Sequence, residues 1–269
     1  MRSIVIIPTY NERENLPPLV AAVLAVAFDA DILVVDDNSP DGTGELAESL
    51  AASTDRVRVL HRAGKQGLGT AYIAGFKYAL AHGYARIVEM DADFSHRPED
   101  LPALLRAAEQ ADVVVGSRNI PGGRAENWSP LRHLISKGGS LYARTLLGLP
   151  IKDCTSGFKC FRREALQAID LDSVVSNGYG FQVEMNYLCH RAGLRLVEVP
   201  IIFPDRTVGH SKMSSRIMRE AATLVWRLRR RRPALVHVPV AAAGRSAEPL
   251  TETVELIPSY AGAMEGSHT

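Results

Sequence analysis

The chain has few cysteines, no long apolar run and almost no net charge, and each absence excludes a class of protein. Its three cysteines, Cys154, Cys160 and Cys189, lack metal-ligand spacing and are odd in number, so we expect a reducing cytoplasm and no disulfide framework. The N-terminal segment MRSIVIIPTY is interrupted by Pro8 too early for a signal peptide. No apolar run approaches the ~20 residues of a membrane-spanning helix. The formal net charge of +1 gives the chain as a whole no attraction to nucleic acid.

What is present is the composition of a soluble globular protein, with 46% hydrophobic and 23% charged residues over 269 positions. The first 120 residues alternate short apolar, β-branched runs with longer helical patterns. We expect strands at 3–7, 32–35, 57–61, 87–90 and 113–116, and helices at 16–27, 41–52, 69–82 and 98–110. Such alternation with short loops predicts an α/β fold with a mainly parallel sheet covered on both faces.

The second half is less regular. We expect helices at 129–149, 181–192 and 214–231, and strands at 155–161 and 196–203. Beyond Pro233 the chain turns to Ala, Pro, Gly, Ser and Glu with little periodicity, which predicts a mobile tail. The expected organisation is one globular domain at 1–215, a basic amphipathic helix at 216–232 and the tail at 233–269.

Polar clusters follow the predicted strands at the points where those strands end. These clusters are residues 8–12, 36–41, 91–96 and 117–118. Ligands of parallel α/β sheets bind outside the carboxyl ends of the strands. The sequence therefore predicts a binding site at this edge of the sheet.

Asp91 and Asp93, in IVEMDADFSH, lie one residue apart after an apolar strand. In extended backbone both side chains point to one side, about 6–7 Å apart along the chain, which suits a hard divalent ion carrying phosphate oxygens. Ser95 or His96 could add a ligand. The alternative is a solvated turn or a helix cap, because Asp93 or Ser95 could cap the helix that follows. Spacing alone leaves both interpretations open.

Two further loops have nucleotide-binding character. Asp36 and Asp37 are adjacent acids at the end of a buried strand, and turn formation does not explain them, so they could accept hydrogen bonds from a base or a ribose. Residues 65–72, KQGLGTAY, resemble a dinucleotide fingerprint, but Tyr72 stands where the third glycine belongs and the loop follows the third strand. A glycine loop beside a nucleotide, with Lys65 near a phosphate, is favoured over a nicotinamide site.

Basic residues recur later in the chain, at Arg118, Arg132, Lys137, Arg206 and Lys212. Singly each could be a solvated charge, but together they could counter a pyrophosphate and a second phosphate. The helix at 214–231 combines a run of arginines with a tryptophan, which is typical of a membrane-surface helix, although an ordinary packing helix remains the alternative. Nucleic-acid binding is a weaker third interpretation, since the rest of the chain shows no basic face.

Taken together, these motifs resemble the family-2 glycosyltransferases of GT-A fold, and among them the dolichol-phosphate (polyprenol-phosphate) mannose synthases. The resemblance covers roughly residues 1–230, in order. It is carried by the motifs PTYNE at 8–12, DDNSPDGT at 36–43, GLG at 67–69, DADFSH at 91–96, GSR at 116–118, GG at 122–123 ahead of NW at 127–128, DCTSGF at 153–158, GYGFQ at 178–182 and RTVGHSK at 206–212.

The resemblance implies metal-dependent, inverting transfer of mannose from GDP-mannose to a polyprenyl monophosphate. It implies Mg²⁺ or Mn²⁺ on Asp91 and Asp93, with Ser95 as a third ligand where some relatives have Gln. It implies catalytic roles for Asp93, Arg118 and Arg206, and an acceptor-phosphate site at Arg118, Arg132 and Ser136. The implied donor-nucleotide contacts are Pro8, Tyr10, Glu12, Val35, Asp36, Asp37, Lys65, Asp91, Ala92, Asp93, Arg118, Arg206 and Lys212.

The lipid acceptor implies a protein at the cytoplasmic face of the membrane, held there peripherally or by a membrane-anchoring partner protein. Three alternatives remain open. A family-2 transferase could use another donor, such as UDP-glucose, or a saccharide acceptor, and a saccharide hydroxyl would need a general base. An inactive sugar-nucleotide or lipid-phosphate binding module is the non-enzyme alternative. An NAD-dependent enzyme is opposed by Tyr72 and by a first strand that runs into Pro8 without glycines.

Overall fold

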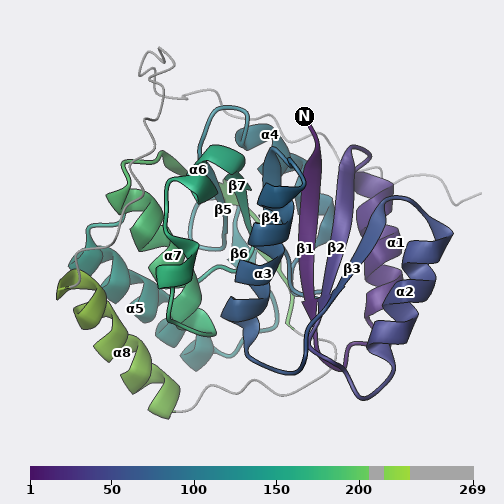
Figure 1. The fold of residues 1–269 in the computed structure, drawn as a ribbon. Helices are drawn as coiled ribbons and strands as arrows, with labels where there is room; N and C mark the ends of the chain where they lie inside the picture. Colours follow the sequence, from purple (N-terminus) through teal and green to yellow (C-terminus); the bar gives the residue numbers. More distant parts are fainter. Residues whose placement is uncertain (206–214, 231–269) are drawn as a thin grey trace, which may run out of the picture. The chain divides into compact units, whose positions relative to one another are not determined.

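A seven-stranded sheet, in the order β3-β2-β1-β4-β7-β5-β8, forms the centre of the computed structural model, which describes residues 1–205 and 215–230 (Figure 1). Every neighbouring pair is parallel except those made by β7, which runs antiparallel to both β4 and β5. The strands are β1 (Ser3–Thr9), β2 (Ala30–Asp36), β3 (Val57–His61), β4 (Arg86–Glu89), β5 (Val113–Ser117), β7 (Lys159–Arg162) and β8 (Leu196–Pro200). A small parallel pair, β6 (Arg124–Ala125) and β9 (Ile202–Phe203), lies apart from this sheet.

Helices cover both faces of the sheet because the central strands are apolar on both sides. In β1, Ile4 and Ile6 belong to one buried cluster, whereas Val5 and Ile7 belong to the other. The helical elements are α1 (Leu16–Val26), α2 (Thr43–Ser53), α3 (Leu68–Ala81), η1 (Pro98–Asp100), α4 (Leu101–Ala107), α5 (Pro130–Leu147), α6 (Arg163–Gln167), η2 (Leu171–Ser173), α7 (Tyr179–Arg191) and α8 (Ser215–Arg230). The predicted α/β architecture is therefore confirmed.

Three details differ from the sequence prediction. The segment expected as a strand at 155–161 forms β7 only from Lys159, and it is the antiparallel member of the sheet. The strand expected at 196–203 is divided into β8 and β9 around Ile201. The helix expected from residue 41 begins at Thr43, because the Asp41 carboxylate accepts hydrogen bonds from the Thr43 amide and hydroxyl and so closes the turn before the helix.

The basic helix predicted at 214–231 is α8, and it packs beside α5 and α7 (Figure 1). Leu224, Val225 and Leu228 are buried in the core, while Trp226 is half exposed. Within residues 1–205 and 215–230, no helix combines the length and the apolar character needed to span a bilayer. The predicted tail at 233–269 lies outside the described residues.

Candidate active site

A cavity of about 210 Å³ opens at the carboxyl ends of β1, β2 and β4. It is lined by Pro8, Thr9, Tyr10, Glu12, Asp37, Lys65, Gly67, Leu68, Ala71, Asp91, Ala92 and Asp93. Four segments far apart in the sequence, which follow β1, β2, β3 and β4, therefore meet at the sheet edge where the sequence predicts a site. Eight predicted donor contacts are brought together here: Pro8, Tyr10, Glu12, Asp37, Lys65, Asp91, Ala92 and Asp93.

Lys65 and Tyr10 form one wall of this cavity, with the Lys65 ammonium nitrogen 3.8 Å from the centroid of the Tyr10 ring. A cation over an aromatic face is attracted by the ring quadrupole, which fixes the direction of an otherwise flexible side chain. Asp37 lies nearby and pairs with Arg62, and it also accepts a hydrogen bond of 3.3 Å from the Gln66 amide. The wall thus presents a cation, an aromatic ring and a carboxylate, which are the groups that bind phosphate, a base and a ribose.

Asp36 points away from the cavity that its neighbour Asp37 lines. Its buried carboxylate accepts hydrogen bonds from the Thr9 hydroxyl at 2.9 Å and from the Ser39 hydroxyl and amide at 2.6 and 3.0 Å. These bonds tie the end of β1 to the loop after β2, and Asp36 does not line the cavity. Val35 is likewise buried in the core. These hydrogen bonds give Asp36 a bracing role, and the direct donor contacts predicted at Asp36 and Val35 stay predictions.

Asp91 and Asp93 both face the cavity, and each carboxylate is held by a neighbour. The Tyr72 hydroxyl donates a 2.8 Å hydrogen bond to Asp91 Oδ1, and burial, followed by the nearby Asp91 charge, raises the pKa of Tyr72 well above its usual value, so it stays a donor. Asp93 Oδ1 accepts from the Ser95 amide and hydroxyl. Phe94 between them has φ 60°, a rare conformation for a bulky residue that marks a constrained loop.

The donor chemistry of this pair fits a hard divalent ion. Within the described residues, no group of three or more His, Cys, Asp and Glu side chains is arranged to hold a metal. Mg²⁺ characteristically uses one or two carboxylates together with substrate phosphates and water, so Asp91 and Asp93 suffice for a metal that arrives with a diphosphate. Ser95 is buried and directed at Asp93, and His96 Nδ1 accepts a hydrogen bond from the Asp91 amide at 2.9 Å. The Ser95 hydroxyl therefore lies beside the carboxylate pair, and its predicted role as the third ligand stays a prediction.

A fully buried ion pair lies next to the loop at residues 91–96, called the carboxylate loop because it carries Asp91 and Asp93. Lys159 Nζ on β7 is 3.8 Å from Glu89 Oε2 at the end of β4, and Lys159 also donates to the side-chain oxygen of Gln182. Burial raises the pKa of Glu89 to about 7, although Lys159 opposes the rise. Burial also lowers the pKa of Lys159, against the attraction of Glu89. The antiparallel insertion of β7 is what brings this cation under the carboxylate loop.

Glu89 should give the protein a distinctive pH dependence of stability. Its folded pKa of about 7 lies above the unfolded value of 4.5, so its contribution to the free energy of unfolding is fully present below pH 4.5 and is lost as pH rises toward 7. We expect Glu89→Gln to remove this part of the slope. Urea unfolding at several pH values between 4.5 and 7.5 measures it, and parallel profiles for the two proteins would contradict the assignment.

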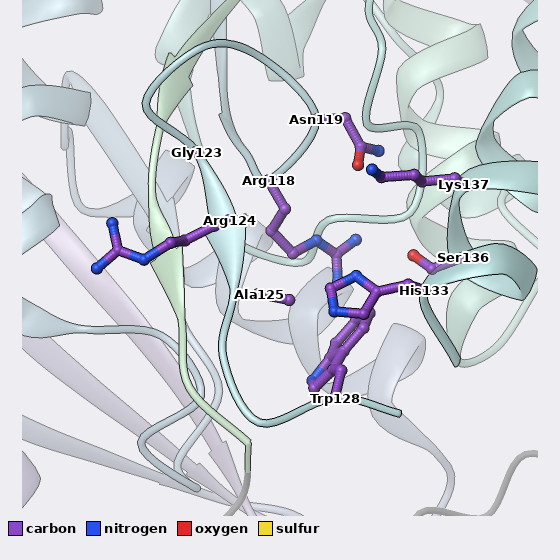
Figure 2. Close-up of a pocket in the computed structure, with 9 residues that line it drawn as sticks. All are labelled: Arg118, Asn119, Gly123, Arg124, Ala125, Trp128, His133, Ser136 and Lys137. Carbon is purple, nitrogen blue, oxygen red and sulfur yellow. The ribbon is translucent and has the colours of Figure 1, made fainter. Parts of the chain in front are cut away.

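A second cavity, of about 110 Å³, follows β5 and is enclosed by α5. Figure 2 shows the Arg118 guanidinium beside Trp128 and His133, with Ser136 and Lys137 of α5 facing it, while Arg124 extends away to the other side. Arg118 is buried and bound by both oxygens of Asp153, through Nε–Oδ2 and Nη2–Oδ1 hydrogen bonds of 2.7 Å each.

The predicted acceptor-site residues converge on this second cavity. Arg118 and Ser136 line it, and Arg132 reaches the Trp128 ring that forms part of its wall. Because β5 runs parallel to β1 and β4, its carboxyl end lies at the same sheet edge as the first cavity. Arg206 and Lys212 lie outside the described residues, so their predicted roles stay predictions.

Three residues that support these cavities were not singled out by sequence reasoning: Tyr72 as a donor to Asp91, Asp153 as the partner of Arg118, and Trp128 as an aromatic wall. Tyr72 was noticed only as a departure from a glycine fingerprint. Asp153 and Trp128 lie within motifs of the resemblance, but nothing in their local pattern indicates which arginine they contact. Tyr72 and Asp91 are 19 positions apart along the chain, and Arg118 and Asp153 are 35 apart, so only the fold brings these partners together.

Comparison with known proteins gives a consistent result. Residues 4–170 match Glycosyl transferase family 2. The chain is 53% identical over 227 residues to an undecaprenyl-phosphate mannosyltransferase of Micrococcus luteus, covering 84% of this chain and 93% of that protein. It is 51% identical over 234 residues to a polyprenol monophosphomannose synthase of Mycolicibacterium smegmatis, covering 86% and 88%.

The fold comparison agrees with the sequence comparison. A mannosyltransferase from Pyrobaculum calidifontis, solved in complex with GDP-Man and Mn²⁺, superposes with a TM-score of 0.52 at 17% identity, covering 82% of this chain and 60% of that one. This likeness concerns the fold alone, and it confirms the predicted GT-A architecture. The matched region, residues 4–170, contains most of the sheet, and both relatives are more than 50% identical to the chain along nearly their whole length. The chain therefore belongs to glycosyltransferase family 2.

Proposed function

We propose that the protein transfers mannose from GDP-mannose to a polyprenyl (dolichyl-type) monophosphate, with inversion at the sugar carbon and with Mg²⁺ or Mn²⁺ on the donor. The observation that carries the proposal is the pairing of a carboxylate-lined cavity with an arginine-lined cavity at one sheet edge. The names of the two relatives supply the sugar and the class of lipid. The first cavity takes the nucleotide-sugar, and the second takes the acceptor phosphate.

The chemistry requires alignment more than base catalysis. A phosphate monoester has a second pKa of about 6, so an acceptor oxygen is already a nucleophile near neutral pH. It forms a bond to the anomeric carbon as the bond to the diphosphate breaks, and this single displacement converts an α-linked donor into a β-linked product. Arg118 and Arg132 orient the acceptor, and Lys65 lies where a donor phosphate oxygen can be bound. A metal held by Asp91 and Asp93 would stabilise the leaving diphosphate as a Lewis acid.

A transfer assay tests the proposal directly. Purified protein is incubated with radiolabelled GDP-mannose or UDP-glucose, a polyprenyl phosphate and Mg²⁺ or Mn²⁺, with and without EDTA. We expect label in the lipid fraction from GDP-mannose and its loss with EDTA. Label in the lipid from UDP-glucose alone favours a family-2 transferase with another donor. In a parallel incubation with a mannose disaccharide added, label in the saccharide in place of the lipid favours a saccharide acceptor. Donor binding with no transfer to any acceptor favours an inactive binding module.

The lipid acceptor calls for contact with a membrane, and α5 offers the surface. Leu131, Leu134 and Leu141 are 66%, 69% and 60% exposed, and the spacing of three and seven residues places them along one side of the helix. Exposed arginines at the end of the neighbouring α8 (Arg227, Arg229 and Arg230) add positive charge. Apolar side chains flanked by basic ones suit the interface of an anionic bilayer. We include peripheral attachment at the cytoplasmic face, through this surface, in the proposal.

Placing charge on this surface should weaken membrane binding. We expect the double variant Leu134→Glu/Leu141→Glu to bind anionic vesicles about tenfold more weakly or worse, since two leucines can no longer enter the interface. Phe28→Glu is the matched control, because Phe28 is 82% exposed but follows α1, away from α5. Co-sedimentation with phosphatidylserine vesicles measures the effect. Equal binding by both variants, or none by the wild type, would instead favour attachment through a membrane-anchoring partner protein.

A further inference from the structure

The structure assigns Trp128 a positioning role in the acceptor site: its indole ring holds the guanidinium groups of Arg118 and Arg132 in place for one phosphate group. This inference rests on the proposed function, because it concerns the cavity given to the acceptor. Trp128 is not among the residues expected to contact either substrate. It contributes by fixing the side chains that do.

Both arginines lie against the same ring. The Arg132 Cζ atom is 4.1 Å from the centroid of the Trp128 ring, and the Arg118 Cζ atom is 5.3 Å from it. Figure 2 shows the Arg118 guanidinium beside the Trp128 ring. Tryptophan is the strongest of the aromatic side chains in attracting a cation to its face. Two guanidinium groups repel each other when they share one site, and the ring lowers the cost of keeping them together. Their direction is therefore set before any phosphate arrives.

Each arginine is fixed from a second side by a carboxylate. Asp153 binds Arg118 through two hydrogen bonds, and Asp205 accepts from Arg132 Nη1 at 2.6 Å. A free arginine side chain has a large rotamer entropy that phosphate binding would otherwise have to overcome. A ring and an acid on each guanidinium remove most of that freedom in advance. This arrangement is what preorganised recognition of an anion requires.

The ring itself is anchored toward the donor cavity. Trp128 meets Phe203 edge to face with 5.5 Å between centroids, and Phe203 meets His96 edge to face at 5.7 Å. His96 stacks on Phe158 at 4.9 Å, and its Nδ1 accepts the amide hydrogen of Asp91. Three rings, those of Trp128, Phe203 and His96, thus connect the second cavity to the backbone of the loop that carries Asp91 and Asp93. The contacts are side-chain packing, which keeps its geometry because protein interiors are densely packed.

Substitution at Trp128 tests the role through Michaelis constants. With a water-soluble short-chain prenyl phosphate as acceptor, we expect Trp128→Leu to raise the KM for the acceptor about tenfold while the KM for GDP-mannose changes little. Trp128→Phe should have an acceptor KM close to that of the wild type, because an aromatic ring remains. Within the described residues the indole nitrogen of Trp128 has no hydrogen-bond partner, so this variant loses no hydrogen bond there. An unchanged acceptor KM, or an equal rise in both KM values, would overturn the inference.

A binding measurement separates this inference from the proposed function. The chain has two tryptophans, so Trp226→Phe leaves Trp128 as the sole indole fluorophore. We expect its emission to change on titration with the prenyl phosphate and, more weakly, with inorganic phosphate. If no mannose is transferred but the emission responds, the proposed reaction is wrong and the phosphate site stands. If mannose is transferred and the emission does not respond, Trp128 has no role in acceptor binding.

Discussion

Replacing Asp93 with asparagine is expected to reduce mannosyl transfer by on the order of a thousandfold, because the Lewis-acid contribution of a bound metal is worth several kcal/mol. The substitution removes one of the two carboxylates that face the donor cavity. The loop should survive it, because the carbonyl oxygen of an asparagine can still accept the hydrogen bonds that Asp93 Oδ1 receives from Ser95. The expected result is therefore a folded, inactive protein.

The measurements are initial rates and the thermal midpoint, together with titration of Mn²⁺ into the protein in the presence of GDP. We expect the variant to lose Mn²⁺ binding and to match the wild type treated with EDTA. Asp55→Asn is the control, since Asp55 is exposed ahead of β3 and does not line the donor cavity. Near wild-type rates for Asp93→Asn would return Asp93 to the role of a turn residue, which is the interpretation that spacing alone left open.

The fold could be predicted from the sequence because its strands and helices have clear local patterns. The apolar runs that became β1, β2, β4 and β5 are buried on both sides, and they are followed by helices with regular periodicity. The position of the site follows from the same argument, since the carboxyl ends of parallel strands gather at one edge. The residues of the donor cavity were predictable to the extent that they lie at those ends.

The contacts that decide which acid does what were not predictable from local pattern. Asp36 and Asp37 are adjacent in sequence, yet Asp36 braces a loop and Asp37 lines the cavity, because successive side chains point in opposite directions. The antiparallel direction of β7 depends on a connection through the irregular second half, and it carries Lys159 under Glu89. Such partners are fixed by long-range packing, which a single sequence does not display.

The largest effect on stability is expected at the Arg118–Asp153 pair. Burial disfavours the Asp153 carboxylate, but Arg118 and two backbone amides outweigh burial and hold its pKa below the usual value. Asp153→Asn would leave the Arg118 charge buried without its counter-charge. Breaking a buried pair by removing one partner costs about 3–5 kcal/mol, so we expect a loss of that size in the free energy of unfolding, measured with urea at pH 7.5.

Asp205→Asn is the matched comparison, because Asp205 pairs with Arg132 in the same acceptor wall but the two side chains are 37% and 18% exposed. A partly solvated pair is worth about 0–1 kcal/mol, so this variant should be nearly as stable as the wild type. The double variant Arg118→Met/Asp153→Leu removes both buried charges and should recover most of the stability while remaining inactive. If Asp153→Asn and Asp205→Asn lower the free energy of unfolding equally, burial of the ion pair does not determine how much its loss destabilises the protein. Recovery of both stability and transfer in the double variant would show that Arg118 contributes to folding and not to the reaction.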